Sequence, residues 1–178
     1  MKRFLLASAL SLAVNAAIAE APGMGPVVKN FGPVFASPEG AYNLRPENHY
    51  KVSMDVSGTG DFVEDRNRHI ESAARFLNMH ARSGIDTEKI DFAVIVHGAA
   101  TKDLLTDAAY RSRYQETNPN TALLGELQQA GVKIYLCSQS AAYKGFEYDE
   151  FNPAVTIALS AMTAHVQLQS EGYTLIPF

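Results

Sequence analysis

Several short segments of the chain alternate hydrophobic with polar residues, and stretches with helical spacing separate them. Residues 50–57 (YKVSMDVS) alternate apolar and polar positions, which predicts a strand with one buried face. Residues 90–97 (IDFAVIVH) contain a nearly continuous apolar run, which is typical of a central strand buried on both faces. Three further strands are expected at residues 132–137 (VKIYLC), 155–159 (VTIAL) and 173–177 (YTLIP).

The segments between these strands have the spacing of helices. From residue 64 to residue 83 apolar residues recur every three or four positions, and Gly84 follows as a stop signal. A short helix is expected around residues 101–109, followed by a polar loop, RSRYQET. The remaining expected helices run from Pro119 to about Gly131 with Asn118 as N-cap, from Ser138 as N-cap to about Lys144, and over residues 160–171.

The order of these elements indicates the fold class. When a strand, a helix and a parallel strand follow one another, the crossover is right-handed and the helices cover the sheet. The sequence therefore predicts an α/β protein, a three-layer α/β/α sandwich around a five-stranded parallel sheet, over residues 50–178.

The N-terminal region has the pattern of a targeting segment. A short cationic start precedes an apolar run at residues 4–14, and a small-x-small site at residues 17–19 follows. This pattern predicts a signal peptide over residues 1–19, cleaved after Ala19, and a periplasmic or secreted protein. No later segment approaches the roughly 20 apolar residues of a membrane span, so no stable membrane insertion is expected after cleavage.

Residues 20–49 are dense in proline and glycine, which excludes a helix or a long paired strand. We expect an extended arm. Its apolar residues indicate that it lies against the domain or against a neighbouring subunit.

Composition and charge narrow the range of partners. The chain has 178 residues, of which 47% are apolar and 19% charged, as in an ordinary folded domain. Because 15 Lys and Arg stand against 19 Asp and Glu, no excess positive charge is available for phosphates, and no nucleic-acid binding is expected. The single cysteine forms neither an internal disulfide nor a CxxC site, and no HExxH spacing occurs. We therefore expect no metal and no other cofactor.

Two residues at predicted strand ends are candidates for chemistry, because reactive groups gather at the carboxyl edge of a parallel sheet. Cys137 directly precedes the predicted helix start at Ser138, where unpaired N–H groups and the helix dipole stabilise a thiolate. His97 ends its strand and lies about 5 Å from Cys137 if the two strands are neighbours, which is the geometry of a Cys/His pair. Gly98 permits close approach of a ligand, and Lys144 adds positive charge if its side chain folds back. The structural alternatives are a buried cysteine and a histidine that closes a strand.

Three segments carry a resemblance to a known family: VHGAA at 96–100, NPNTALLGELQQAGVKIYLCSQSAAYKG at 118–145 and ALSAMTAHVQLQSEGYTLIPF at 158–178. Through them the sequence resembles the DsrE/DsrF-like family, whose domain is also called YchN-like. A cysteine, a small residue, a basic residue and a glycine of the family's LC-x3-A-x2-KG pattern match Cys137, Ala141, Lys144 and Gly145.

The resemblance implies a fold, an assembly and a function. It implies a five-stranded parallel sheet with the second and third strands adjacent, and assembly into trimers or hexamers. Its better-understood members relay sulfur: the cysteine that matches Cys137 accepts a sulfane sulfur as a persulfide and passes it to a partner protein. We therefore expect a periplasmic sulfur carrier or sulfurtransferase-type protein, with His97 as proton partner and with a sulfur donor or acceptor protein as partner.

Two other interpretations stay open. One is a non-catalytic oligomeric binding or assembly module that keeps the fold and buries the thiol. The other is a small-ligand sensor that uses the His97 and Gly98 rim at the strand-end edge without covalent chemistry. The candidate ligand-binding residues are Gly98, Ser138 and Lys144.

Overall fold

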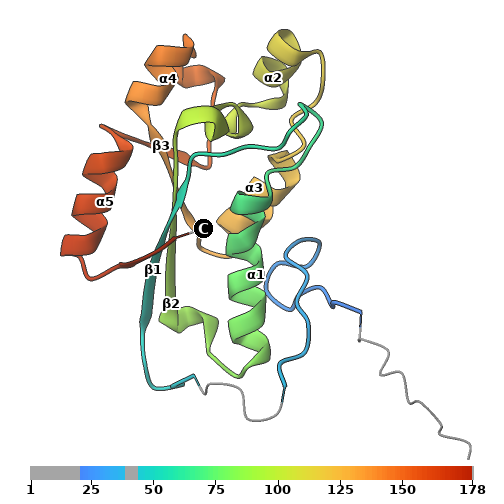
Figure 1. The fold of residues 1–178 in the computed structure, drawn as a ribbon, viewed down its shortest axis with the longest axis vertical. Helices are drawn as coiled ribbons and strands as arrows, with labels where there is room; N and C mark the ends of the chain where they lie inside the picture. The colour runs from blue at the N-terminus through green and yellow to red at the C-terminus, as the bar shows by residue number, and fades with distance from the viewer. Residues whose placement is uncertain (1–20, 39–43, 178) are drawn as a thin grey trace, which may run out of the picture.

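Five strands form one sheet in which every neighbouring pair is parallel, in the order β4-β3-β2-β1-β5 (Figure 1). The computed structural model describes residues 21–38 and 44–177, so the predicted signal peptide lies outside the described residues. The predicted sheet type and the adjacency of the second and third strands are confirmed. The strands are β1 (Tyr50–Val56), β2 (Ile90–Val96), β3 (Lys133–Cys137), β4 (Val155–Ala158) and β5 (Thr174–Ile176).

Helices cover both faces of this sheet, which confirms the three layers (Figure 1). One face carries α1 (Arg68–Arg82) and α3 (Thr121–Gln129), and the opposite face carries α5 (Ala161–Ser170). Two shorter helices, α2 (Asp107–Tyr114) and α4 (Ser138–Lys144), lie at the carboxyl end of the sheet. The 3-10 helices are η1 (Thr87–Lys89), η2 (Gly98–Leu104) and η3 (Tyr148–Glu150).

The two faces of the sheet bury unequal amounts of apolar surface. The cluster beneath α1 and α3 contains 26 buried hydrophobic residues, whereas the cluster beneath α5 contains seven. Strand alternation explains the division on β1, because Met54 and Val56 point to the larger cluster while Asp55 points to the α5 face. Since hydrophobic stabilisation scales with buried area, α5 is the less tightly packed layer.

The predicted positions of one helix and of the loop after it are wrong. The helix expected around residues 101–109 is replaced by η2 and, after a break, by α2, which takes in the first residues of the predicted loop RSRYQET. The break occurs at Thr106, whose side chain accepts a hydrogen bond from the N–H of Ala109 and so caps a new helix. Apolar spacing alone does not reveal this cap.

The start of α3 also differs from the prediction. Asn118 does not cap a helix that begins at Pro119, because its Oδ1 accepts instead from the N–H of Asn120 at 2.9 Å. Its Nδ2 donates to two carbonyl groups of the η2 region, at 3.0 and 2.7 Å. The buried Asn118 amide thus joins two loops, and α3 begins two residues after Pro119.

Residues 21–38, the first part of the predicted arm, lie against α1 and α3 (Figure 1). Asn78, buried in α1, accepts from the N–H groups of Val28 (2.9 Å) and of the residue before it, and donates to three carbonyl groups of the same segment. Glu126 of α3 accepts from the N–H of Lys29 at 2.9 Å. This segment is therefore attached to the helical layer opposite α5.

His80 links the packing of α1 to pH. Its side chain is buried, with 6% of its surface exposed, and its Nδ1–H donates to the carbonyl of Phe76 at 2.8 Å. The ring stacks on Phe76 and meets the ring of Tyr50 edge-on. Burial lowers the pKa of His80 below its ordinary value, because it disfavours the imidazolium.

We expect the free energy of unfolding to fall as the pH drops from about 7.5 to about 5, because burial lowers the pKa of His80 in the folded protein. Below about pH 6.5 the unfolded chain binds a proton at this residue that the folded protein resists. Urea unfolding at several pH values measures the slope, which should be smaller in His80→Gln than in wild type. An equal slope in wild type and His80→Gln would contradict the assignment.

Candidate functional site

Cys137 is the last residue of β3 and also the N-cap of α4. Ser138, predicted as the cap, is instead the first residue of that helix, and its Oγ donates to the carbonyl of Leu159 at 2.8 Å. This bond ties the start of α4 to the loop before α5. Only 5% of the Cys137 surface is exposed, so the thiol lies beneath the first turns of two helices.

Hydrogen-bond donors surround the Cys137 sulfur. Burial by itself raises the pKa of the thiol, because a thiolate loses solvation. The Ser140 hydroxyl and the backbone N–H groups of Ala161, Ser140 and Gln139 bond to the sulfur and outweigh burial, so the pKa of Cys137 lies below its ordinary value. The exposed Lys144 is not among these groups. Neutral donors, and not a lysine, therefore favour the thiolate.

Ser140 connects Cys137 with the loop that follows β2. Its Oγ accepts from the N–H of Gly98 at 3.1 Å and bonds to the Cys137 sulfur. Gly98 has φ +57°, and a Cβ at this position would lie 3.3 Å from the carbonyl oxygen of Ser57. Glycine is therefore required here by the backbone conformation and by the close approach of another chain segment.

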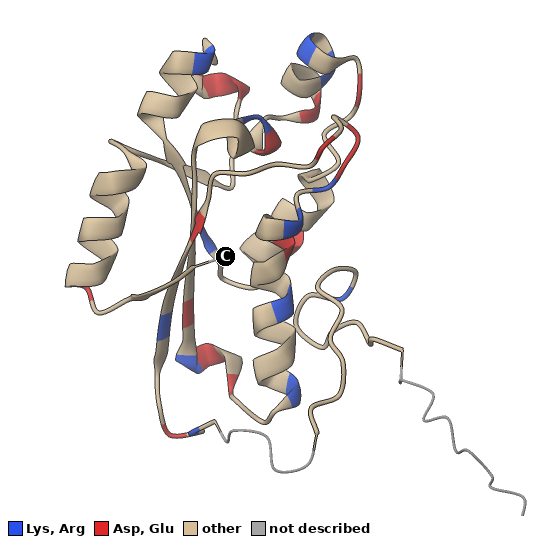
Figure 2. Ribbon diagram, viewed as in Figure 1, with Lys and Arg blue, Asp and Glu red and all other residues tan. Residues whose placement is uncertain are grey.

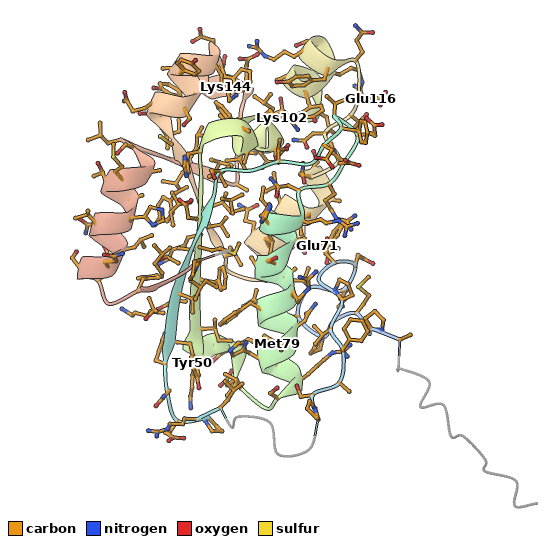
Figure 3. The ribbon with its side chains drawn as sticks, in the orientation of Figure 1. Tyr50, Glu71, Met79, Lys102, Glu116 and Lys144 are labelled. Atoms are coloured by element: carbon orange, nitrogen blue, oxygen red, sulfur yellow. The ribbon has the colours of Figure 1, made fainter. Side chains whose placement is uncertain are left out.

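A cavity of about 380 Å³ opens beside the thiol at the carboxyl edge of the sheet. Lys144 contributes to it from the outer end of α4 (Figure 3). Because Gln139 and Ser140 form part of its wall and also contact the sulfur, Cys137 lies one layer behind the cavity. The wall is formed by Gly98, Ala99, Gln139, Ser140, Tyr143 and Lys144.

His97 follows β2 directly, and its imidazole bonds to β1. The pairing of Val96 with Leu136 places His97 beside Cys137 on the neighbouring strand. The His97 Nε2 lies 3.1 Å from both carboxylate oxygens of Asp55. His97 and Cys137 are thus neighbours in the sheet, but the hydrogen bonds of the thiol go to α4 and α5.

Asp55 and His165 complete a cluster that the sequence reasoning missed. His165 of α5 places its Nε2 2.7 Å from the Oδ1 of Asp55, and since a carboxylate only accepts, both imidazoles donate to it. Burial raises the pKa of Asp55, but these hydrogen bonds and the nearby imidazole charges outweigh it, and the pKa lies below its ordinary value. An acidic residue near the end of an alternating strand was the available sequence signal, because that position lies near the carboxyl edge.

Within residues 21–38 and 44–177, no group of three or more His, Cys, Asp and Glu side chains is arranged to hold a metal ion. No helix in the same ranges is both long enough and apolar enough to cross a bilayer.

Comparison with known proteins places the fold among solved structures. A family model described as the DsrE/DsrF-like family matches residues 51–178. MTH1491, a protein of unknown function from Methanobacterium thermoautotrophicum, aligns with a TM-score of 0.54 and 20% identity over 72% of this chain and 99% of that chain. The ychN protein of E. coli aligns with a TM-score of 0.52 and 15% identity over the same shares. No curated protein matches the chain.

Replacing the Ser140 hydroxyl tests the environment of the thiol. We expect Ser140→Ala to lower the thiolate fraction of Cys137 at neutral pH by about threefold to tenfold, because one hydrogen bond to a charged sulfur is lost. Ultraviolet absorbance of the thiolate against pH, with Cys137→Ser subtracted, measures this fraction. Ser72→Ala, whose hydroxyl bonds within α1, is the matched control, and an unchanged titration in Ser140→Ala would refute the assignment.

Proposed function

The chain belongs to the DsrE/DsrF-like family, and we propose that it is a periplasmic sulfur carrier in which Cys137 accepts a sulfane sulfur as a persulfide. The observation that carries this proposal is the set of donors around the sulfur, which stabilise the thiolate and lower the pKa of Cys137.

The proposed reaction is a sulfur exchange that balances without a cofactor. The Cys137 thiolate attacks the terminal sulfur of a donor such as thiosulfate or a polysulfide. A new S–S bond forms while the donor's S–S bond breaks, and the donor's leaving anion departs with the electron pair. The outer sulfur is then passed to an acceptor by attack of another thiolate.

His97 is the proposed proton partner of this exchange. Its side chain is 31% exposed and lies beside Cys137 at the edge where the leaving anion emerges. Because both carboxylate oxygens of Asp55 hold its Nε2, the ring has a fixed orientation. His97 is suited to exchange protons with solvent and with the leaving group.

The proposed location rests on the pattern of residues 1–19. A cationic start, an apolar run and a small-x-small site support export and cleavage after Ala19. A sulfur carrier in that compartment would exchange sulfur with exported donor and acceptor proteins.

Intact-mass measurement after incubation with thiosulfate or polysulfide tests the proposal. We expect wild type to gain the mass of one sulfur atom, reversed by a reducing thiol, because the Cys137 persulfide is the stable product. Cys137→Ser should gain nothing, and a small-molecule thiol treated in parallel shows that the donor is active. No gain in wild type under conditions that load the control thiol would favour the binding or assembly module.

We also propose that the protein assembles into a trimer or hexamer through β4 and α5. Three large apolar side chains on these elements and a fourth, Leu159, between them are exposed, and neither element carries Lys, Arg, Asp or Glu (Figure 2). An uncharged apolar surface meets no like-charge repulsion from a second copy of itself, which supports self-association. The exposed residues are Ile157, Leu159, Met162 and Val166.

Light scattering of the chain from residue 20 at micromolar concentration tests the assembly. We expect an oligomer for wild type and a several-fold lower mass for Met162→Lys combined with Val166→Glu, because these side chains are 77% and 69% exposed and would be buried on assembly. Phe62→Lys, at an exposed apolar residue away from α5, is the control. A strict monomer in wild type would overturn the proposal.

A further inference from the structure

The helix above Cys137 is held by little apolar packing. Its buried residues are Ala161, Ala164 and Leu168, and the cluster beneath it is the smaller of the two cores. Two alanines contribute few contacts compared with larger side chains, so polar contacts carry more of the positioning of α5 than they do for α1.

Two polar contacts join the first half of α5 to the sheet. The N–H of Ala161 donates to the Cys137 sulfur, and the Nε2–H of His165 donates to Asp55 of β1 at 2.7 Å. Residues four apart lie on the same face of a helix, so one face makes both contacts, one turn apart. Ser160 caps the same turn through the N–H of Thr163 and leaves the Ala161 N–H free for the thiol.

We propose that Asp55 and His165 are positioning residues whose hydrogen bond holds the first turn of α5 on the sheet, over the buried Cys137 sulfur. The inference rests on the proposed role of Cys137 as the sulfur acceptor, but it concerns the free thiol. His97 donates to the same carboxylate from β2 and fixes Asp55 from the other side.

The partners of His165 are few. Its Nδ1 is buried and has no hydrogen-bond partner among the residues that the structure places. The bond to Asp55 is therefore the polar contact that fixes this ring. Loss of Asp55 leaves the His165 side chain without a polar anchor on the sheet.

The alternation of the strands places the other titratable side chains beneath α5 on the same face as Asp55 and Cys137. Tyr135 is level with Asp55, two strands away, and the others lie toward the amino ends, where the Lys133 Nζ donates to the Tyr173 hydroxyl at 2.9 Å. Of these groups, only Asp55 forms a hydrogen bond with His165. They are Lys51 of β1, Asp91 of β2, Lys133 and Tyr135 of β3, and Tyr173 before β5.

Access to the sulfur distinguishes positioning from direct electrostatics. Loss of Asp55 removes a negative charge and also changes the charge balance of the two imidazoles that it holds, so the ionisation pH of Cys137 alone does not separate the two roles. A higher alkylation rate of the fully ionised thiol is expected only if the first turn of α5 no longer covers the sulfur.

The experiment titrates the Cys137 thiolate by ultraviolet absorbance in Asp55→Ala and His165→Leu, without any sulfur donor. We expect the thiolate fraction at neutral pH to fall by about threefold to tenfold in each variant, and the alkylation rate of the fully ionised thiol to rise because the first turn of α5 covers it less. The double variant should show little more than either single change, since both remove one contact. Asp61→Ala and His69→Leu, at exposed positions, are the matched controls.

The conservative variants keep the test decisive if a larger change prevents folding. His165→Gln retains an N–H donor, so the ionisation pH of Cys137 should stay close to that of wild type. Asp55→Asn should shift this ionisation pH in the same direction as Asp55→Ala, but by less. An unchanged alkylation rate of the fully ionised thiol in Asp55→Ala and His165→Leu would overturn the inference. Sulfur loading is measured separately, so failure of wild type to load contradicts the proposed function alone, whereas an unchanged alkylation rate contradicts only the positioning role.

Discussion

The balance between burial and hydrogen bonding at one sulfur atom governs the whole site. Burial of Cys137 opposes the thiolate, and donors from two helix starts oppose burial more strongly. Three of those donors are backbone N–H groups, which depend on where the helices begin, and the fourth is the Ser140 hydroxyl on the first turn of α4. Every element that places α4 or α5 relative to β3 therefore contributes to the chemistry of the thiol.

The parallel sheet supplies this arrangement through its topology. Because all five strands run in one direction, the ends of β2 and β3 and the starts of α4 and α5 meet at the same edge. Ser160 caps α5, and the Ser138 hydroxyl donates to the carbonyl of Leu159 in the loop before α5. These two contacts set the first turn of α5 beside the first turn of α4. The two helices converge on Cys137 although their first residues are 23 positions apart in the sequence.

The strands and the position of Cys137 could be predicted from the sequence, but two helix starts and the bond between Asp55 and His165 could not. The difference lies in how far along the chain the deciding interactions reach. Apolar alternation located the strands, and the end of one apolar run located Cys137, because both depend on neighbouring residues. The helix starts after Thr106 and Asn118 could not be predicted, since buried side-chain hydrogen bonds decide them. The bond between Asp55 and His165 joins residues 110 positions apart and depends on how α5 crosses the sheet, which no local pattern specifies.

The burial of the thiol bears on the proposed role as a carrier in an oxidising compartment. A lone exposed thiolate there is open to disulfide formation with other chains and to stepwise oxidation. A thiol one layer behind a cavity is shielded while its donors keep it reactive. Access then requires local movement, and such movement arises first where few buried contacts must break. Helix α5 meets that condition, because small side chains and two polar contacts hold this helix over Cys137.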